Sequence, residues 1–526
     1  MRFLPVNLDA LLVELDDLAQ TLALLASLQA EPIDGIEELL PAARTLLVRY
    51  GPYKTSAQQL AAQIARRSLT RNARQAGTLV EIPVDYQGED LDAVAAMLGM
   101  SRAEVIACHT GSEYQAAFAG FAPGFAYLTG GDPRLNVARR ATPRTRVPAG
   151  AVALAGTFSA VYPQASPGGW QIIGVTTEKM WDLDRTVPAL VQPGFRVRFI
   201  DASRRPAPAP RAERVQPAPA APPGAALRVR NAGLQTLFQD LGRHGLSGQG
   251  VSASGALDQG AVRAANRLVG HAAGSAVLEI VDGGFELQSQ GETVVAVTGA
   301  DGPLELTTPG GARWPVPRGQ AIALADGDRL KLGAPHAGLR SYLAVRGGFA
   351  VAPVLGSCAT DTLAKLGPPP IASGDLLPLR GAPAQGGVVG APELPRADLP
   401  SLDAIVTLDV VLGPRTDWCT AEAVALLAEQ VWTVTPQSNR VGLRLAGEQP
   451  LARANLAELP SEGTVPGAIQ VPPNGQPVLF LADHPLTGGY PVIGAVATYD
   501  LDRAGQIPIG ARIRFHPIRP FTPLQP

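Results

Sequence analysis

The chain has few cysteines, few lysines and little net charge, and each shortage excludes a class of protein. Its cysteines are Cys108, Cys358 and Cys419, and they form no Cys-x-x-Cys pair. Their wide spacing indicates neither a zinc site nor a disulfide framework, and it favours a reducing cytoplasm. A net charge of -2 and a pI near 6.3 argue against nucleic acid as a partner.

Lysine is almost as scarce as cysteine, occurring as Lys54, Lys179, Lys331 and Lys365. None of them follows a glycine, so the sequence contains no GxxxxGK[ST] phosphate-binding loop. A biotin-accepting lysine typically lies between two methionines, whereas Lys179 has a glutamate on one side. We therefore expect no covalent biotin on this chain.

No segment of the sequence is suited to a membrane. The apolar run from Leu22 to Leu28 is far shorter than a bilayer span. The first residues lack the basic start, apolar core and small-residue cleavage site of a signal peptide. We therefore expect a cytoplasmic protein with no membrane partner.

Glycine and proline are abundant by contrast. The chain has 57 glycines and 49 prolines, a proportion that suits many short strands joined by tight turns. Helical spacing of apolar residues marks short segments, including 16–29, 56–67 and 259–269. The sequence therefore predicts a mainly β fold with α+β parts.

Two regions organise the chain. Strand-like segments at residues 10–14 and 46–50 alternate with the first two helical segments, which predicts a small β-α-β-α unit over residues 1–77. Residues 203–224 are rich in proline and alanine and have no apolar period, so they are predicted to be a linker between two halves.

The most distinctive stretch is residues 120–170. Turn-rich segments at 120–125 and 166–170 bracket the basic segment 139–146. Glycine and proline fix the backbone there, and arginine forks suit carboxylate or phosphate groups. The pattern predicts an anionic ligand held over rigid loops. The alternative is a turn-rich barrel whose arginines are merely solvated.

This stretch resembles the first, B-type subunit of the bacterial ATP-dependent 5-oxoprolinase. That family also covers kinase-inhibitor-like proteins and allophanate hydrolase subunit 1. The pattern GF-x-PGF-x-YL matches residues 120–127, P-R-x-x-VPAG corresponds to 143–150, and YP-x-x-SPGGW matches 162–170. One departure is Val137-Ala138, where the family usually has a proline before its paired arginines.

The second half resembles the C-type partner of that subunit, also called allophanate hydrolase subunit 2, and the carboxyltransferase region of urea carboxylase. The resemblance rests on a series of short motifs, found at residues 239–243, 255–258, 265–270, 278–279, 356–357, 467–472 and 487–490. Three departures stand out: Cys358 and His484 replace family arginines, and Asn439 replaces an aspartate.

The resemblance implies a fusion of the B-type and C-type subunits with cyclophilin-like β-barrels in both halves. The expected divisions are a small α/β domain at 1–77, a barrel at 78–202, a linker at 203–225, and two barrels of the carboxyltransferase-like half at 226–395 and 396–526. It implies opening of 5-oxo-L-proline to L-glutamate with ATP and Mg²⁺, a third 5-oxoprolinase subunit as partner, and a homo-oligomer.

Two other functions stay open from the sequence. One is a carboxyltransferase-type module that acts on urea or another amide with a separate biotin carrier. The other is a regulatory protein that binds and inhibits a kinase through its first half.

The candidate site residues come from these motifs. The candidate catalytic residues are His109, Asp258 and Asp483. The candidates for binding the amide substrate or ATP are Pro123, Gly124, Arg140, Arg144, Gly168, Gly169, Gln239, Asp240, Arg243, Asn266, Glu279, Gln470, Thr487, Gly488, Gly489 and Tyr490. No spacing of His, Cys, Asp or Glu residues indicates a metal site.

Several candidates have structural alternatives. His109 could be a half-buried histidine at the end of a helix, and Asp258 could be a helix N-cap. Asn266 and Glu279 lie among apolar residues and need hydrogen-bond partners if they are buried. Residues 483–490 could form an ordinary hairpin.

Overall fold

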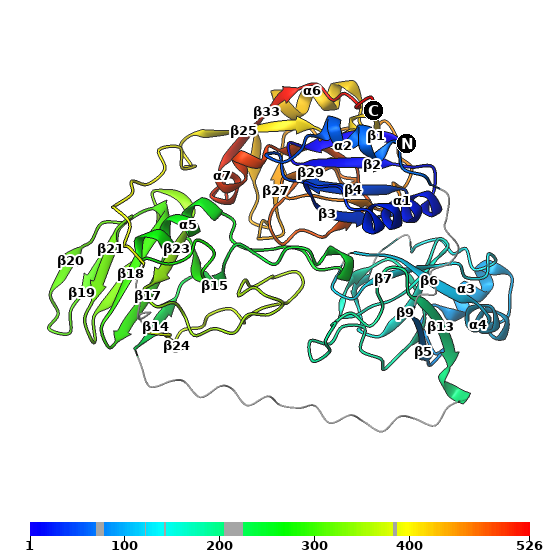
Figure 1. The fold of residues 1–526 in the computed structure, drawn as a ribbon, viewed down its shortest axis with the longest axis horizontal. Coiled ribbons are helices and arrows are strands. Elements are labelled where there is room, and N and C mark those ends of the chain that lie inside the picture. The colour runs from blue at the N-terminus through cyan, green and yellow to red at the C-terminus, as the bar shows by residue number, and fades with distance from the viewer. Residues whose placement is uncertain (70–77, 121, 141, 143, 205–224, 382–386) are drawn as a thin grey trace.

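The computed structural model describes residues 1–69, 78–120, 122–140, 142, 144–204, 225–381 and 387–526 (Figure 1). Strands dominate these residues, which confirms the mainly β class. Most of the predicted linker, together with Phe121, Ala141 and Pro143 of the motif-rich stretch, lies outside the described residues. None of the described helices is long and apolar enough to cross a membrane.

The N-terminal region forms an antiparallel four-stranded sheet. Its strands, in sheet order, are β1 (Arg2–Asn7), β2 (Ala10–Glu14), β4 (Thr45–Tyr50) and β3 (Ile36–Pro41). Two helices pack against it, α1 (Leu18–Ala30) and α2 (Ala57–Ile64), which lie within the predicted helical segments and have Asp17 and Ser56 as N-caps. The predicted β-α-β-α unit therefore missed two strands, β1 and β3.

Residues 78–204 build a seven-stranded sheet around a separate apolar core. In sheet order its strands are β12 (Gln171–Val175), β9 (Ala151–Ala155), β10 (Phe158–Val161), β7 (Ala126–Thr129), β6 (Glu113–Ala119), β13 (Arg196–Asp201) and β5 (Leu79–Val84). Two helices, α3 (Leu91–Leu98) and α4 (Arg102–Gly111), lie in sequence between β5 and β6. Ser101 and Glu104 form a capping box at the start of α4. A small ribbon pairs β8 (Arg144–Val147) with β11 (Ser166–Gly168), and the short helix η1 covers Ala202–Arg204.

Residues 225–381 form two sheets that share one apolar core. The first has the order β20 (Arg313–Pro315), β19 (Leu304–Thr307), β22 (Arg329–Leu332), β17 (Phe285–Gln290), β14 (Ala226–Ala232) and β24 (Leu376–Pro378). The second has the order β15 (Gln235–Gln239), β16 (Val277–Val281), β23 (Ala337–Val345), β18 (Thr293–Asp301) and β21 (Ala321–Leu324). The short helix η2 (Ser247–Gln249) precedes α5 (Gln259–Leu268), which packs on the second sheet.

The C-terminal region closes into a barrel. Around the barrel run β25 (Ile405–Leu412), β32 (Val492–Val496), β29 (Ala468–Gln470), β30 (Val478–Phe480), β27 (Gly442–Ala446), β26 (Trp432–Val434) and β33 (Arg512–Arg519). Its helices are η3 (Pro414–Trp418), α6 (Ala421–Glu429), η4 (Thr498–Asp500) and α7 (Leu501–Gly505), and a two-stranded ribbon joins β28 (Glu462–Gly463) to β31 (Thr487–Gly488).

The N-terminal sheet packs on this C-terminal barrel (Figure 1), and its unit also contacts the seven-stranded sheet that follows it in sequence, where Leu18 and Leu22 of α1 pack against the cluster of Phe118. Leu12 and Leu47 share an apolar cluster with Phe480. The ends of the chain also meet, because the Leu524 amide donates to the Phe3 carbonyl at 2.8 Å. The two halves are therefore interleaved, and the first half contacts the second through both of its parts.

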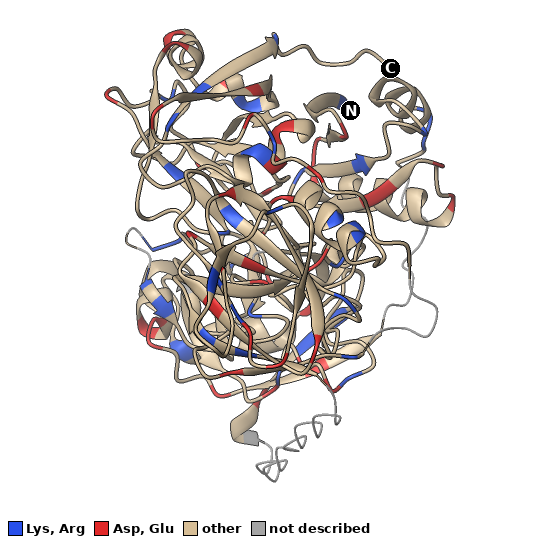
Figure 2. Cartoon of the chain, turned by 90° about the vertical axis from the view of Figure 1, so that its left-hand side faces the viewer, with Lys and Arg blue, Asp and Glu red and all other residues tan. Residues whose placement is uncertain are grey.

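Charged residues of both signs are mixed along the chain. Figure 2 shows lysines and arginines interspersed with aspartates and glutamates along the ribbon. This distribution agrees with the small net charge of -2.

Candidate site at the junction of the halves

Segments from both halves of the chain meet at one small cavity of about 10 Å³. The motif of residues 120–127 contributes Ala122 and Pro123, and the segment that follows η2 contributes Gly250 and Ser252. The segment before β31 contributes His484. Its other lining residues are Asp361, Leu363, Ala364, Pro485 and Leu486. Both halves of the chain therefore form this cavity, which we call the junction cavity.

Glycines allow the backbones of the two halves to approach closely. The Gly124 amide donates to the Gln249 carbonyl at 2.9 Å. Gly250 has a φ of +78°, and a Cβ at that position would lie 2.5 Å from the Ala122 carbonyl oxygen. A Cβ on Gly120 would meet the Thr487 hydroxyl at 2.4 Å. These contacts fix the loop that carries Pro123 against the second half.

Next to the cavity, Arg440 joins two buried carboxylates. Its Nε and Nη2 donate to the two oxygens of Asp483, both at 3.0 Å, and its Nη1 donates to Glu279. The Arg440 side chain is 1% exposed, while those of Glu279 and Asp483 are fully buried. Burial favours a neutral Asp483, but the guanidinium outweighs it and holds the pKa of Asp483 below its ordinary value. This ion cluster joins β16 to the barrel.

Asp483 is also tied to the loop that carries Asp361. Thr362 donates to Asp483 through its amide at 2.9 Å and its hydroxyl at 2.7 Å. The Ser254 hydroxyl donates to the same carboxylate at 2.6 Å, and Ser254 has a positive φ of 51°. A non-glycine residue in this region of φ/ψ space carries strain, and such strain is often stored at functional sites.

Asp361 is buried, and its carboxylate accepts three hydrogen bonds. The donors are the amides of Leu363 at 3.0 Å and Ala364 at 2.8 Å and the Ser252 hydroxyl at 2.8 Å. Burial, reinforced by the neighbouring Asp483, raises the pKa of Asp361 to about 6. The two adjacent carboxyl groups therefore have pKa values displaced in opposite directions.

Arg243 lies behind the wall of the junction cavity. Its amide donates to Ala253, next to Ser252, and its Nη2 donates to Ala359, two residues before Asp361. Arg243 is 2% exposed, and its Nε and Nη1 have no hydrogen-bond partner among the described residues. Burial lowers the pKa of Arg243, and Asp361 and Asp240 oppose that effect. Two buried N–H donors of Arg243 are therefore left to donate to an oxygen atom of a ligand or water.

The other residues of the 239–243 motif brace the same loop. Asp240 accepts from the Ser357 hydroxyl and the Cys358 amide, both at 2.6 Å. The side-chain amide of Gln239 donates to Thr360 at 2.8 Å, while its oxygen has no partner among the described residues. This motif therefore holds residues 357–360, which lead directly to Asp361.

His484 forms another part of the cavity wall. Its Nδ1 lies 2.9 Å from the Pro485 carbonyl and 3.2 Å from the Thr464 hydroxyl, and its ring stacks on Phe480. Burial lowers the pKa of His484 to about 4. The imidazole is therefore neutral near pH 7, with Nδ1–H donating to the carbonyl and Nε2 left as an acceptor.

Asp258 and Asn266 have structural partners. Asp258 is the N-cap of α5, where its Oδ1 accepts from Ala261, and its Oδ2 accepts from the Gln506 side chain at 2.8 Å. Burial raises the pKa of Asp258 to about 6. The Asn266 side chain donates to the carbonyls of Ala273 and Ser275. These contacts support the capping and buried-network alternatives for both residues.

The predicted arginines of the first half contact Asp90. Arg140 Nη1 lies 2.8 Å from Asp90, and both Arg144 Nη atoms reach the same carboxylate at 2.8 and 2.9 Å. Burial of Asp90 is outweighed by Arg144 and other donors, which lower the pKa of Asp90. Gly168 pairs with Arg144 across the β8–β11 ribbon, and the Gly169 carbonyl accepts from the Arg140 amide. The predicted anion site is thus already neutralised within the chain.

His109 lies in the core of the first half. Its Nδ1 is 2.7 Å from the Tyr86 hydroxyl, its Nε2 is 2.9 Å from the Ser159 hydroxyl, and its ring stacks on Phe199. The side chain is fully buried, and burial lowers the pKa of His109 to about 3. The structure therefore supports a satisfied core histidine and does not bring His109 to the junction cavity.

The last group of candidates surrounds β31. Glycine at position 488 leaves room for Gln470, because a Cβ there would lie 2.6 Å from Gln470 Nε2. Gln470 donates to the Tyr490 carbonyl at 3.4 Å, and Tyr490 is 44% exposed. Thr487 pairs with Gly463, and Gly489 follows the ribbon. These residues form a ribbon next to His484, with Tyr490 reaching the solvent.

Four residues at or beside the cavity were not among the sequence-based candidates. Arg440 and His484 drew attention only through departures from the family pattern, and Ser252 and Asp361 belong to none of the motifs. Ser252 lies between Gly250 and Gly255 in sequence, which was a usable signal. The loop of Asp361 reaches the cavity only through tertiary contacts. Among the described residues, no group of three His, Cys, Asp or Glu side chains is arranged to hold a metal.

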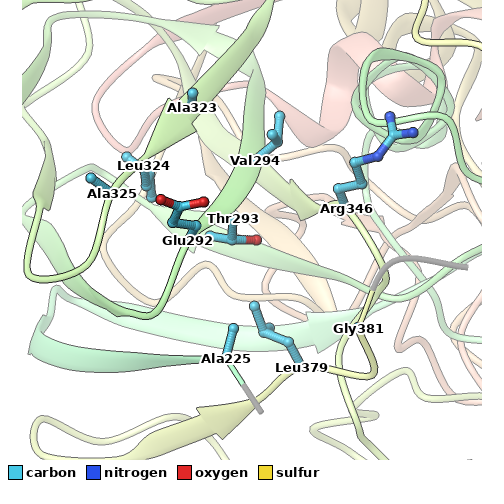
Figure 3. Close-up of a pocket in the computed structure, with 10 residues that line it drawn as sticks. All are labelled: Ala225, Glu292, Thr293, Val294, Ala323, Leu324, Ala325, Arg346, Leu379 and Gly381. Carbon is cyan, nitrogen blue, oxygen red and sulfur yellow. The ribbon is translucent and has the colours of Figure 1, made fainter.

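A larger pocket of about 420 Å³ lies elsewhere, between strand ends of the two sheets of residues 225–381 (Figure 3). Ala225 and Leu379 form one side, Val294 and Leu324 the other, and Arg346 and Glu292 lie at the rim. In Figure 3 the Arg346 guanidinium extends away from the Glu292 carboxylate. None of the candidate residues lines this pocket.

Comparisons with known proteins identify the class. Residues 1–191 match the family model "Carboxyltransferase domain, subdomain C and D", and residues 249–517 match "Carboxyltransferase domain, subdomain A and B". The chain therefore belongs to the carboxyltransferase-domain family, and both motif-based resemblances are confirmed.

Individual relatives show which members of this family the two halves are similar to. The chain is 36% identical over 295 residues to the C-type subunit of 5-oxoprolinase from Escherichia coli, covering 55% of this chain and 90% of that protein. It is 36% identical over 200 residues to the B-type subunit of 5-oxoprolinase from Bacillus subtilis, covering 34% and 81%. The solved structure of TTHA0988 is 34% identical with a TM-score of 0.81, covering 96% of this chain and 99% of that one. One chain thus carries regions similar to two separate subunits.

Proposed function

We propose that this chain is a fused B- and C-type subunit of an ATP-dependent 5-oxoprolinase. With a separate partner subunit it would open 5-oxo-L-proline to L-glutamate. One observation carries the proposal: residues of the 120–127 motif in the B-type half line the same cavity as residues from three segments of the C-type half. A fusion of two unrelated binding proteins gives no reason for such convergence.

The chemistry explains why ATP is needed. A lactam is a poor electrophile, and transfer of a phosphoryl group to its amide oxygen makes the carbonyl carbon reactive. Mg²⁺ would accompany the nucleotide. Buried donors stabilise the charge that develops in such a step, because a site of low dielectric strengthens their interaction. Arg243 offers two donors of this kind beside the junction cavity.

The direct test is reconstitution. The purified chain is mixed with the third subunit, ATP, Mg²⁺ and 5-oxoproline, and glutamate and phosphate are measured together. We expect the two products to appear in step and to depend on 5-oxoproline, with little of either from each protein alone. Matched controls omit ATP, Mg²⁺ or the partner. A verified partner that yields no glutamate would falsify the assignment.

The family's carboxyltransferase domains favour a second candidate, in which this chain carboxylates urea or another amide. That activity requires a carboxylated biotin carrier from another chain. Urea and a biotinylated carrier, supplied in place of 5-oxoproline and ATP, distinguish the two. Transfer of labelled carboxylate from the carrier to urea, without glutamate formation from 5-oxoproline, would establish this second candidate.

A further inference from the structure

Asp361 is a buried carboxyl group on the wall of the junction cavity that no sequence motif contains. Its loop is held from three sides: by Asp240 through residues 357 and 358, by Asp483 through Thr362, and by the Asp361 amide, which donates to Leu366. A carboxylate held this firmly has a fixed direction, as an acid–base group requires.

The neighbouring carboxyl group, that of Asp483, differs from Asp361 in its protonation. Asp483 is paired with Arg440 through two hydrogen bonds, which keeps it ionised. The hydrogen bonds that Asp361 accepts come from neutral donors, and burial raises its pKa to about 6. Adjacent titratable groups whose pKa values are displaced in opposite directions are the usual pattern of a site that handles a proton.

The cavity has the size and the lining for one water molecule. Its volume of about 10 Å³ is near the smallest that can hold a water. A buried water needs two to four polar partners, and this wall offers the Asp361 carboxylate, the Ser252 hydroxyl and the His484 imidazole. His484 Nε2 has no hydrogen-bond partner among the described residues and can accept one.

Resting on the 5-oxoprolinase function proposed above, we propose that Asp361 is a catalytic residue. It takes a proton from the water that attacks the activated amide carbon and returns that proton to the departing nitrogen. Ser252 orients the Asp361 carboxylate, and His484 orients the water.

Atoms, electrons and protons balance through the reaction. The amide oxygen bonds to the γ-phosphorus of ATP and ADP leaves, so the carbon becomes electrophilic and the nitrogen keeps its hydrogen. The water oxygen bonds to that carbon while one water proton passes to Asp361. The C–N bond then breaks, and the nitrogen takes the proton from Asp361 and the proton of the new hydroxyl group, leaving as an ammonium group. A second water cleaves the remaining acyl phosphate to carboxylate and inorganic phosphate.

The test is Asp361→Asn in the full chain assembled with the third subunit. Asparagine keeps the acceptor for the two loop amides but cannot take the proton. Glutamate release is measured beside positional isotope exchange in ATP labelled with ¹⁸O at the β,γ-bridge, which reports reversible phosphoryl transfer. We expect glutamate release to fall about 100-fold or more, in the range of lost acid–base catalysis, while isotope exchange is retained or increased.

Two further variants keep the test decisive. Ser252→Ala removes the hydroxyl that donates to Asp361, and a smaller fall in glutamate release with retained exchange is expected. Asp328→Asn is the matched control, because Asp328 is another buried aspartate that accepts a loop amide but lies outside the cavity lining. It should leave both rates unchanged.

The opposing outcomes are distinct. If exchange and glutamate release fall by the same factor in Asp361→Asn or Ser252→Ala, or if glutamate release is unchanged, Asp361 is not the proton carrier. If Asp361→Asn does not fold, the Ser252→Ala result decides. A wild-type complex that makes no glutamate overturns the proposed function itself, and the inference falls with it.

Discussion

Two arginine–carboxylate clusters in the molecule differ in their surroundings. In the first half, Arg140 and Arg144 share Asp90, and their side chains are 35% and 16% exposed. In the second half, Arg440 joins Asp483 and Glu279 with a side chain that is 1% exposed. Both clusters have a buried carboxylate, since the Asp90 side chain is 5% exposed, but only the guanidinium groups of the first cluster reach solvent. The first cluster also keeps a second arginine if one is lost, whereas the second cluster is a fixed joint between β16 and the C-terminal barrel.

The largest expected effect tests this difference directly. Arg440→Met removes the cation and leaves two carboxylates buried without their partner, which should cost about 3–5 kcal/mol of unfolding free energy. Arg144→Met is the matched change at the first cluster, where Arg140 still pairs with Asp90, and it should cost less, about 1 kcal/mol. Urea denaturation followed by tryptophan fluorescence measures both. Equal losses would contradict the contrast between the clusters.

The second prediction uses the opposite pKa displacements of Asp361 and Asp90. The folded-state pKa of Asp361, about 6, exceeds its ordinary value, so the folded protein loses stability as pH rises from 4 to 7. Asp361→Asn removes this loss, so its stability relative to wild type should be more favourable at pH 7 than at pH 4 by roughly 2 kcal/mol.

Asp90 should behave in the opposite way. Its folded-state pKa is lowered, so its stabilising effect is present above the unfolded pKa and is lost as pH falls. Asp90→Asn should therefore be more destabilising at pH 7 than in acid. Urea titrations at several pH values between 3 and 8 give both comparisons. Parallel pH profiles for the two variants would refute the assigned directions.

The smallest expected effect concerns the contact between the halves. Gly250→Ala places a Cβ against the Ala122 carbonyl and imposes a positive φ on alanine, which should cost about 1–2 kcal/mol. Gly248→Ala is the control on the same loop, because a Cβ there meets nothing within 4 Å. Thermal melting compares the stability of the two variants. Glutamate production with the partner subunit shows whether activity survives the backbone displacement at the junction cavity. Equal melting temperatures for the two variants would mean that the contact of Gly250 with Ala122 does not stabilise the packing of the two halves.

Local rules predicted the local structure well. The helical segments predicted at 16–29, 56–67 and 259–269 contain α1, α2 and α5, whose N-caps are Asp17, Ser56 and Asp258. Capping depends on residues only three positions apart, so a short sequence displays it. The strands β1 and β3 were missed. Their pairing with β2 and β4 is set by tertiary contacts, which a single segment of sequence does not display.

The candidate site was harder to predict, and the wrong predictions of its residues share one cause. The arginine-rich segment was chosen for its charge, but the partner that neutralises it, Asp90, lies about fifty positions away. Asp361 reaches the junction cavity on a loop that contains no motif. His109 was chosen because histidine can act as an acid or base, but its side chain is buried in the core beside Tyr86. The 120–127 motif identified one segment of the cavity wall, whereas the other segments and the side chains that face one another depend on how the halves pack.

The contact between Phe3 and Leu524 has a consequence for the order of the two halves along the chain. Because these residues near the two ends are neighbours, a short peptide could join the last residue to the first. New ends could then be opened in the proline- and alanine-rich segment between residues 205 and 224. The resulting circular permutant would carry the C-type half first and keep every described contact at the junction. For this architecture, the packing of the two halves therefore does not fix their order along the chain.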